Sequence, residues 1–480
     1  MKPQLAIRTN ANHEIGIGHI HRTLAYADYI SDFFEVTFYI DQTNEMVYDL
    51  VRKADYCLEI LPFKSVVQDI SRMLNRSQLI ILDGYSFDTE YQKALKELGH
   101  KILIIDDLNA WHQLADVVIN HAYTGSADDY QIGRETKLYT GFNYIILKEA
   151  FLKALFSGQR SNIQRVLICI GGTDPNGYSC KIAQYMLEST DKNITIITYS
   201  INTHYEALKQ LEAANPERCK MLIGLNANEL VTCFSSNDLA ILQPSNIALE
   251  ACAVGIGVAL LQTADNQKFI KHNLLYSGCA VEFTVDTFHT IADISLDTVN
   301  KQIAAQSQLP FKKARKNHRG IIMDTFLYFR MAEPADVDFV YACNNDKLTR
   351  QNSYNPNAIE YSSHKNWYEN KIQSPDSIFL IFTLLDTHTG MVRIDKVSSE
   401  HIISITIAPI FRGLGLAATM LRKASSFYFN KTNATEITAF IKTENMASYK
   451  AFLEAGFHLV ETKLYNGSES YKMILKNERY

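Results

Sequence analysis

Two glycines and a histidine stand where the first apolar run of the sequence gives way to an amphipathic helical pattern. They are Gly16, Gly18 and His19, with Arg22 one turn further along. Glycines at such a turn let a diphosphate approach the backbone, and the amides at the start of a helix stabilise anionic charge. A neutral imidazole placed there could take a proton from water. The alternative is a tight turn whose histidine only packs or caps, and this motif taken alone favours that alternative.

A second group of small and polar residues follows later apolar runs. A glycine-rich loop offers backbone amides to phosphate, small polar side chains can reach a pyrophosphate, and a helix carboxylate can accept both ribose hydroxyls. Taken singly, that carboxylate, Glu250, is more typical of a helix surface. Together and in this order the residues indicate a nucleotide-sugar site. They are Gly171, Gly172, Thr173, Asp174, Ser245, Asn246, Glu250, Asp265, Asn266 and Gln267.

Short apolar runs alternate with helical patterns through the first two thirds of the chain. This alternation predicts parallel sheets with helices on both faces. A polar break at 157–162 separates two similar halves, so we predict Rossmann-like domains over 1–150 and 164–318 that face a cleft. The expected strands are 4–8, 36–40, 79–83, 101–106 and 117–120 in the first half, and 165–170, 194–198, 220–223, 239–242 and 258–261 in the second.

Basic residues gather between 306 and 320, a stretch that includes His318. Charge runs are mostly solvated, so a surface helix or linker is favoured over a phosphate site. Beyond this stretch, apolar runs at 377–385, 390–396 and 402–408 suggest antiparallel strands, and a glycine-rich turn and a long helix follow. This change of pattern predicts a third domain over 324–480.

The composition is close to the average of soluble globular proteins: 47% of the 480 residues are hydrophobic and 21% are charged. A net charge of -5 argues against nucleic acid as the main partner. No apolar run approaches the roughly 20 residues that span a bilayer, and the N-terminal apolar run is too short for a signal peptide. None of the eight cysteines forms a Cys-x-x-Cys pair. We therefore expect buried free thiols, no metal site and a cytoplasmic protein.

The first 285 or so residues resemble the UDP-2,4-diacetamido-2,4,6-trideoxy-β-L-altropyranose hydrolase family of pseudaminic acid biosynthesis. The resemblance rests on the glycine–histidine motif with Arg22, on the segment 82–85, and on the segments 171–175 and 264–267. It implies a glycosyltransferase-B fold of the MurG type and attack of water at the anomeric carbon, with inversion and with UDP leaving. The sequence departs from the family at Gln243-Pro244-Ser245-Asn246, where relatives have a small Gly-Ser/Thr loop.

The same resemblance assigns roles to individual residues. His19 would be the base, with Tyr85 and Asn266 near the sugar. Glu250, Ser245 and the 171–174 loop would hold UDP. The remaining substrate-binding residues that it implies are Gly16, Gly18, Arg22, Asp83, Asn246, Asp265 and Gln267.

The third domain carries its own candidate anion site. An R-x-x-G-x-A pattern lies between a strand-like run and a long helix, where it offers consecutive amides to a pyrophosphate. An asparagine and a Gly-Phe pair follow further along the chain. The two elements together resemble the acetyl-CoA site of the GNAT superfamily of N-acetyltransferases, which implies a GNAT α/β domain with acetyl-CoA as cosubstrate. The residues are Ile407, Arg412, Gly413, Leu414, Gly415, Leu416, Ala417, Asn445, Ser448 and Phe452.

The opening of this domain resembles acetyltransferases that act on UDP-4-amino-4,6-dideoxy sugars. The matching residues, which would bind the sugar, are Asn344, Arg350, Tyr354, His364 and Trp367, and helix packing is an equal alternative for the last two. Many members of the superfamily place a tyrosine seven residues after the asparagine, where this chain has Phe452. The general acid is therefore unidentified, and Glu400 is only a guess for the base.

These observations together predict a bifunctional enzyme. The third domain would acetylate a UDP-linked amino-deoxy sugar with acetyl-CoA, and the first two would hydrolyse the UDP-sugar product. The alternative is a glycosyltransferase-B enzyme that passes the sugar to an acceptor alcohol, with the third domain as a non-catalytic acyl-CoA-binding module. Neither alternative requires a nucleic acid, a membrane or a metal.

Overall fold

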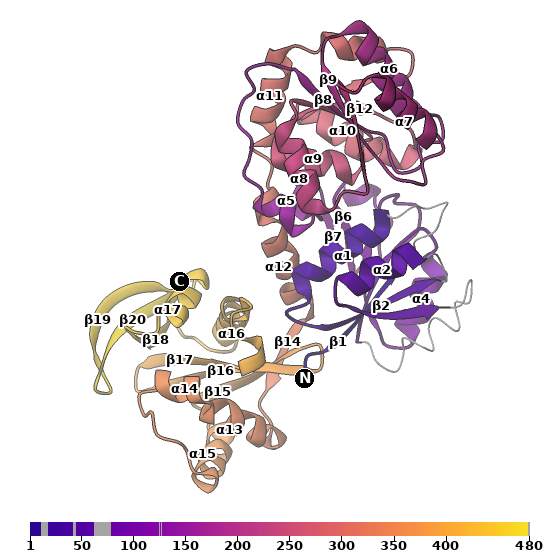
Figure 1. The fold of residues 1–480 in the computed structure, drawn as a ribbon. Coiled ribbons are helices and arrows are strands. Elements are labelled where there is room, and N and C mark those ends of the chain that lie inside the picture. Colours follow the sequence, from indigo (N-terminus) through magenta and orange to yellow (C-terminus); the bar gives the residue numbers. More distant parts are fainter. Residues whose placement is uncertain (11–17, 42–44, 62–77, 124, 126, 479–480) are drawn as a thin grey trace. The chain divides into compact units, whose positions relative to one another are not determined.

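The computed structural model describes residues 1–10, 18–41, 45–61, 78–123, 125 and 127–478. The chain forms two compact units. The first unit contains residues 5–31 and 36–318 and includes two parallel sheets (Figure 1). The second contains residues 319–480 together with the short segments 1–4 and 32–35. Gly16 lies outside the described residues, so its predicted role as an anion-binding glycine has no structural description.

The first parallel sheet has the strand order β3-β2-β1-β4-β5-β6-β7. Its central strand β4 is completely buried and is built from Leu, Ile and Asp only, as expected for a strand covered by helices on both faces. The helices are α1 (Gly18–Ile30), α2 (Glu45–Lys53), α4 (Thr89–Glu97) and α5 (Glu149–Lys153). The strands are β1 (Gln4–Thr9), β2 (Glu35–Asp41), β3 (Cys57–Leu61), β4 (Leu79–Asp83), β5 (Lys101–Ile105), β6 (Val117–Asn120) and β7 (Lys137–Thr140).

The second parallel sheet repeats this arrangement with the order β10-β9-β8-β11-β12-β13. The core formed by its strands and helices is almost entirely aliphatic. The helices are α6 (Tyr178–Ser189), α7 (Tyr205–Ala214), α8 (Ala227–Ser236), α9 (Asn246–Val254), α10 (Lys268–Tyr276) and α11 (Leu296–Gln306). The strands are β8 (Arg165–Cys169), β9 (Asn193–Thr198), β10 (Cys219–Ile223), β11 (Leu239–Leu242), β12 (Gly257–Leu261) and β13 (Val281–Phe283).

In both sheets the strand order reverses beside the first strand, between β1 and β4 and between β8 and β11. Ligands of such sheets bind outside the carboxyl ends of the strands at this reversal, because the connecting segments diverge there. The loops predicted from sequence to bind a nucleotide sugar follow these strands. The topology therefore places them where a ligand site is expected.

The second unit contains a mixed sheet in the order β14-β15-β16-β17-β18-β20-β19. Strands β17 and β18 are its parallel pair, and they match only at Ile402 and Thr438, so they diverge toward their carboxyl ends. The strands are β14 (Leu327–Met331), β15 (Ser377–Leu384), β16 (Thr387–Val397), β17 (Glu400–Ile407), β18 (Glu436–Lys442), β19 (His458–Tyr465) and β20 (Ser468–Lys476). The helices are α13 (Val337–Asn345), α14 (Lys347–Asn352), α15 (Tyr361–Gln373), α16 (Leu416–Lys431) and α17 (Met446–Glu454).

The predicted fold class, two Rossmann-like domains followed by a further α/β domain, is confirmed. The strands that the sequence missed in the parallel sheets are short and lie at sheet edges. β7 has no buried residue and β13 has three residues, so neither shows the continuous apolar run of a central strand. The cysteines, all within the described residues, are free, and Cys57 is exposed rather than buried as expected.

The basic stretch near residue 318 is a helix, α12 (Ala314–Phe326), but it is not solvated along its whole length. The His318 side chain is completely buried. Its Nε2 lies 3.0 Å from the carbonyl oxygen of Tyr144, and its ring packs 5.1 Å from that of Tyr26. Burial lowers the pKa of His318 to about 4. Counting charges along the sequence could not reveal this burial, because the stretch is basic through its lysines and arginines and the buried side chain is the imidazole of His318.

His318 is expected to make stability depend on pH. The pKa of the folded state lies below the unfolded value of about 6.5, so the unfolded chain binds the proton more readily as the pH falls from 6.5 to 4. Stability is therefore lost over that interval, by about 3 kcal/mol for this group. His318→Gln, which keeps an N–H donor, should reduce the slope of unfolding free energy against pH. Urea unfolding at pH 7.5, 6 and 4.5 measures it, and equal slopes in both proteins would contradict the assignment.

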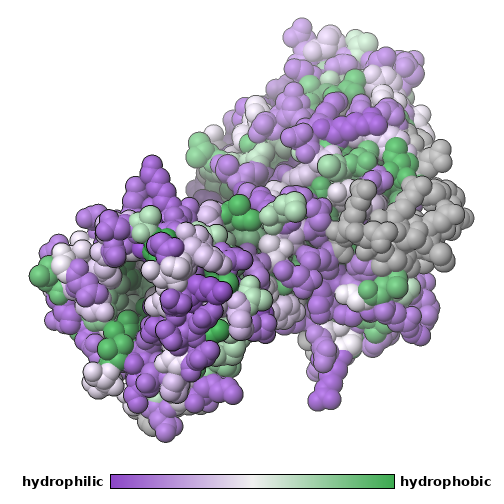
Figure 2. Space-filling model, turned by 90° about the horizontal axis from the view of Figure 1, so that it is seen from below, coloured by the Kyte–Doolittle hydropathy of each residue, from purple (hydrophilic) through white to green (hydrophobic). Residues whose placement is uncertain are grey.

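Figure 2 shows a mostly hydrophilic face, with hydrophobic residues in small separate groups among the atoms drawn in colour. In the described part of the chain, the helices are all too short or too polar to cross a bilayer. The same residues contain no group of three or more histidine, cysteine or acidic side chains arranged for a metal ion.

Candidate functional site

His19 lies in the first turn of α1 and is oriented by a buried carboxylate. Its Nδ1 is 2.7 Å from Oδ1 of Asp83, the last residue of β4. Both side chains are almost inaccessible to solvent. A carboxylate can only accept, so Nδ1 carries the proton and donates it to Asp83, which leaves the lone pair on Nε2. His19 lies on the helix that follows β1 and Asp83 ends β4. The strand order reverses between these two strands, so the topology brings the two residues together.

Arg22 completes this cluster one turn further along α1. Its Nε donates to Oδ2 of Asp83 at 2.9 Å, and its Nη2 donates to Oδ2 of Asp107 at 3.0 Å. Desolvation alone would raise the pKa of Asp83, but Arg22 and His19 outweigh it and lower that pKa to about 2. Arg22 is therefore fully engaged by two carboxylates. Its hydrogen bonds to Asp83 help to hold that carboxylate in position beside His19.

Asp107 follows β5 and was not selected from the sequence as a site residue. Its signal was available, since Asp83 ends one buried parallel strand, Asp107 follows the next, and such strand ends share one edge of a sheet. His121 follows β6 at the same edge of the sheet, and it was also not selected from the sequence. It is completely buried, and Asn246 at the start of α9 is one of the groups that interact with it.

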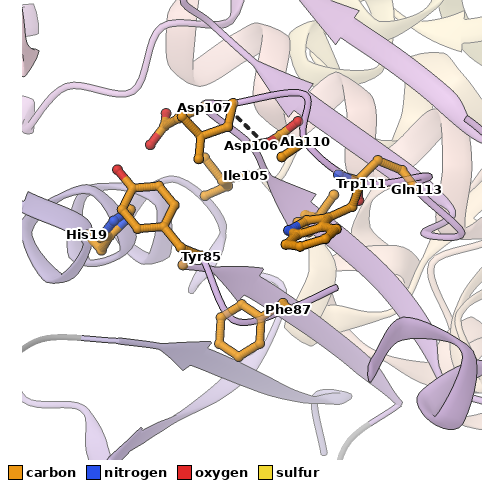
Figure 3. Close-up of a pocket in the computed structure, with 12 residues that line it drawn as sticks. His19, Tyr85, Phe87, Ile105, Asp106, Asp107, Ala110, Trp111 and Gln113 are labelled. Carbon is orange, nitrogen blue, oxygen red and sulfur yellow. Dashed lines mark hydrogen bonds between the residues drawn. The ribbon is translucent and has the colours of Figure 1, made fainter. Parts of the chain in front are cut away.

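Tyr85 connects the two parallel-sheet domains of the first unit. Its ring packs edge-on against His19 with the centroids 4.8 Å apart, and its hydroxyl accepts a hydrogen bond of 2.9 Å from Nδ2 of Asn266. The structure thus brings together the three residues predicted to be catalytic. In Figure 3 the Tyr85 hydroxyl and the Asp107 carboxylate lie on the His19 side of a pocket, and Trp111 lies on the opposite side.

The glycine loop after β8, which was predicted to bind phosphate, is closely packed at its first glycine. Gly171 has a φ of +72°, and a Cβ there would lie 2.7 Å from Oε1 of Gln243. The glutamine that distinguishes this chain from the expected small loop therefore packs directly on Gly171. Asp174 is less available than predicted, because its carboxylate caps α6 by accepting from the amides of Tyr178 and Ser179.

The other residues of this domain that were predicted to bind the nucleotide differ in the contacts and the exposure of their side chains. Ser245 is the N-cap of α9, and its side chain makes no capping hydrogen bond. Gln267 turns back into its own loop, where its Oε1 accepts from the amide of Thr263 at 2.8 Å. Thr173 and Asp265 are exposed, and Gly172 lies beside the ring of Tyr199.

Glu250 faces Lys148 from the other parallel-sheet domain of the first unit. Burial raises the pKa of Glu250 to about 7, and the opposite charge of Lys148 lowers it only in part. Burial likewise lowers the pKa of Lys148. Glu250 is half-buried on α9, and as a carboxylate it can accept hydrogen bonds from a bound diol.

The glycine turn of the second unit leaves the start of α16 open. Gly413 and Gly415 have φ values of +76° and +84°, and open space surrounds the position of a Cβ at each. Arg412 anchors this turn, since its Nη2 lies 2.6 Å from Oδ2 of Asp346 and its Nε donates to the carbonyl oxygen of Ile407 at 3.2 Å. The turn follows β17, where the two parallel strands diverge, and Leu414, Leu416 and Ala417 complete it.

The second sequence element of this domain lies on α17. Asn445 caps the helix by accepting from the amide of Ser448 at 3.1 Å. Phe452 is buried and packs 4.9 Å from the ring of Phe457. Glu400, the guessed base, is engaged by Lys472 with 2.9 Å between Nζ and Oε1. The described contacts therefore leave both proton-transfer groups unassigned.

Among the residues predicted to bind the acceptor sugar, some contact their own loop or pack against aromatic rings, and one makes a polar contact with a neighbouring strand. Arg350 donates to the carbonyl oxygens of Asn344 and Asn355 and so holds its own loop together. His364 is buried among aromatic rings, with Trp367 5.4 Å away, which supports packing for this residue. Tyr354 keeps a polar contact, 2.9 Å from Oγ of Ser470.

Comparison with known proteins also divides the chain into the region of the two parallel sheets and the region of the mixed sheet. Residues 327–458 match the family model of the acetyltransferase (GNAT) domain. The UDP-2,4-diacetamido-2,4,6-trideoxy-β-L-altropyranose hydrolase of Campylobacter jejuni is 24% identical over 284 residues, which are 58% of this chain and 99% of that protein. The chain joins a region homologous to this hydrolase to a GNAT domain.

Two further relatives extend this result. The spore coat polysaccharide biosynthesis protein SpsG of Bacillus subtilis is 23% identical over 286 residues, 58% of this chain and 83% of that protein. The uncharacterized protein MJ1062 of Methanocaldococcus jannaschii is 22% identical over 488 residues, 95% of this chain and 96% of that protein. The hydrolase-homologous region and the GNAT domain therefore match a relative along nearly the whole chain.

Proposed function

We propose that the hydrolase-homologous region cleaves UDP from an N-acetylated amino-deoxy sugar and that the GNAT domain installs an acetyl group on its 4-amino precursor. The observation that carries the first part is the buried His19–Asp83 pair at the carboxyl ends of β1 and β4. The name of the Campylobacter jejuni relative supports the sugar, and the GNAT match supports acetyl-CoA as the donor. We place both reactions in pseudaminic acid biosynthesis and in the cytoplasm.

The hydrolysis needs one proton acceptor. Water attacks the anomeric carbon while the bond from that carbon to the UDP oxygen breaks, with inversion, and Nε2 of His19 takes the proton of the water. Asp83 keeps the imidazole in the required tautomer and stabilises the imidazolium that forms. UDP leaves with its negative charge, so no acid is needed when amides such as those at the start of α9 hold it. Two carboxylates, as in most glycosidases, are then unnecessary.

The acetyl transfer uses the second unit alone. The neutral sugar amine attacks the thioester carbonyl of acetyl-CoA and loses a proton to water as the carbon–nitrogen bond forms, and the carbon–sulfur bond breaks to release coenzyme A. The open space around Gly413 and Gly415, at the start of α16, supports a site for the pyrophosphate of acetyl-CoA there. Phe452 has no hydroxyl to protonate the thiolate, and we propose that water supplies this proton, since a thiol is a tolerable leaving group.

One incubation tests both reactions. The full chain is mixed with acetyl-CoA and UDP-4-amino-4,6-dideoxy-β-L-AltNAc, and the products are followed by mass spectrometry. We expect coenzyme A, UDP and a free sugar that carries one added acetyl group. A sugar transferred to an added alcohol, with no free sugar in its absence, would indicate a glycosyltransferase. Bound acetyl-CoA without any acetylated sugar would reduce the GNAT domain to a binding module.

A further inference from the structure

One edge of the mixed sheet in the second unit is a long and exposed strand. Strand β19 ends the strand order and, among the described residues, pairs with β20 alone (Figure 1). It has eight residues and none of them is buried, whereas the other five strands that end a described sheet have three to five residues each. The N–H and C=O groups that point outward from such an edge are a template for a further strand. Of the described sheet edges, β19 is therefore the most open to pairing.

The side chains of β19 combine exposed apolar residues with two opposite charges. Leu459, Val460 and Leu464 are 42%, 52% and 75% exposed. Exposed apolar residues on a long edge strand favour association with another chain. A lone charge would discourage that association, but Lys463 stands two positions from Glu461, with 3.5 Å between Nζ and Oε1. The strand thus presents an apolar surface and a pair of opposite charges to a partner.

Symmetry limits how two copies of β19 can pair. In an antiparallel pair the two-fold axis is perpendicular to the sheet, so each face of one strand continues into the same face of the other. In the regular part of the strand, opposite residues are then both odd-numbered or both even-numbered, and the axis passes through a residue. An axis through Glu461 or Lys463 would place like charges directly opposite each other, which is destabilising. An axis nearer either end of the strand would leave fewer residues paired.

An axis through Thr462 avoids both problems. Glu461 of one copy then lies opposite Lys463 of the other, and the symmetry repeats this contact, so that four charges alternate in sign. Leu464 lies opposite Val460 of the other copy, and the two threonines face each other, a favourable cross-strand pair. The pairing ends near Val460, where the register of β19 against β20 shifts.

We propose that two copies of this chain associate through β19, as an antiparallel pair centred on Thr462 that joins their mixed sheets. The partner is a second copy, because the charges and apolar residues of β19 are complementary to those of the same strand under this symmetry. Such an isologous contact ends at a dimer and does not continue into a fibre. Two paired strands bury little area beside the roughly 1,200–2,000 Å² of stable complexes, so the dimer dissociates on dilution. The proposal is independent of the two reactions proposed above.

Sedimentation velocity of the full chain at increasing concentration measures the association. The wild type is expected to change from monomer to dimer. Glu461→Lys and Lys463→Glu each replace two attractive contacts by two repulsive ones, so each should raise the dissociation constant about tenfold or more. Lys450→Glu makes the same change of charge at an exposed residue of α17. It is the matched control and should associate as the wild type does.

Mixing the two charge variants tests the register. In a pair of one Glu461→Lys chain with one Lys463→Glu chain, both cross-strand contacts are attractive again. The mixture should therefore associate like the wild type although neither variant does so alone, and so should a chain that carries both changes. A wild type that stays monomeric at every concentration would overturn the proposal. Association that neither variant weakens, or a mixture that stays monomeric, would overturn it as well.

Discussion

His19→Ala is expected to lower kcat for UDP release by about 10²–10⁴-fold, the range of a positioned general base. Loss of the imidazole leaves water without a proton acceptor, while the proposed contacts to UDP lie in the other parallel-sheet domain. UDP affinity should therefore stay close to that of the wild type. Initial rates of UDP release at saturating substrate, together with calorimetry of UDP binding, measure the two quantities separately.

A matched variant distinguishes the base from its neighbour. Tyr85→Phe keeps the ring that packs on His19 and removes only the hydroxyl that accepts from Asn266. We expect it to lose much less activity than His19→Ala. Turnover in His19→Ala near that of the wild type would remove His19 from the mechanism.

Asp83→Asn should affect both activity and stability. The side chain is completely buried and faces Arg22 and His19, so the amide leaves Arg22 with one carboxylate instead of two. Removing one partner of a buried ion pair costs about 3 kcal/mol or more. The amide can also donate to Nδ1 of His19, which places the proton on Nε2 and removes the base. The free energy of urea unfolding and the rate of UDP release measure the two effects.

The stability effect should disappear in acid. The pKa of Asp83 is about 2 in the folded protein and about 3.9 in the unfolded chain, so its contribution is complete above about pH 5 and is lost as the pH falls through 2. Asp107→Asn is the control, because Asp107 is more accessible and lies beside the same arginine. A larger loss of stability for Asp107→Asn than for Asp83→Asn would contradict the proposed roles.

Much of the fold followed from local patterns. Central strands such as β4 and β11 are short and completely buried, and buried parallel strands must be apolar at almost every position. The glycine turn before α16 was recognisable for a similar reason, since Gly413 and Gly415 have positive φ values that favour residues without side chains.

The partners of the site residues were not local. Asp174, which was predicted to bind phosphate, caps α6, and Arg350, which was predicted to bind the sugar, also donates to carbonyl oxygens of its own loop. Side chains of the same type bind a ligand or satisfy the backbone, and only the arrangement of donors and acceptors around each one distinguishes these uses.

By itself the sequence determined the central strands of the parallel sheets, the glycine turn before α16 and the glycine–histidine motif, because these depend on neighbouring residues. Only the tertiary structure decided that Asp83 orients His19 and that Gln243 packs on Gly171. Those contacts join residues 64 and 72 positions apart. The folding of parallel sheets brings such residues to one edge, and no local spacing encodes which of them meet.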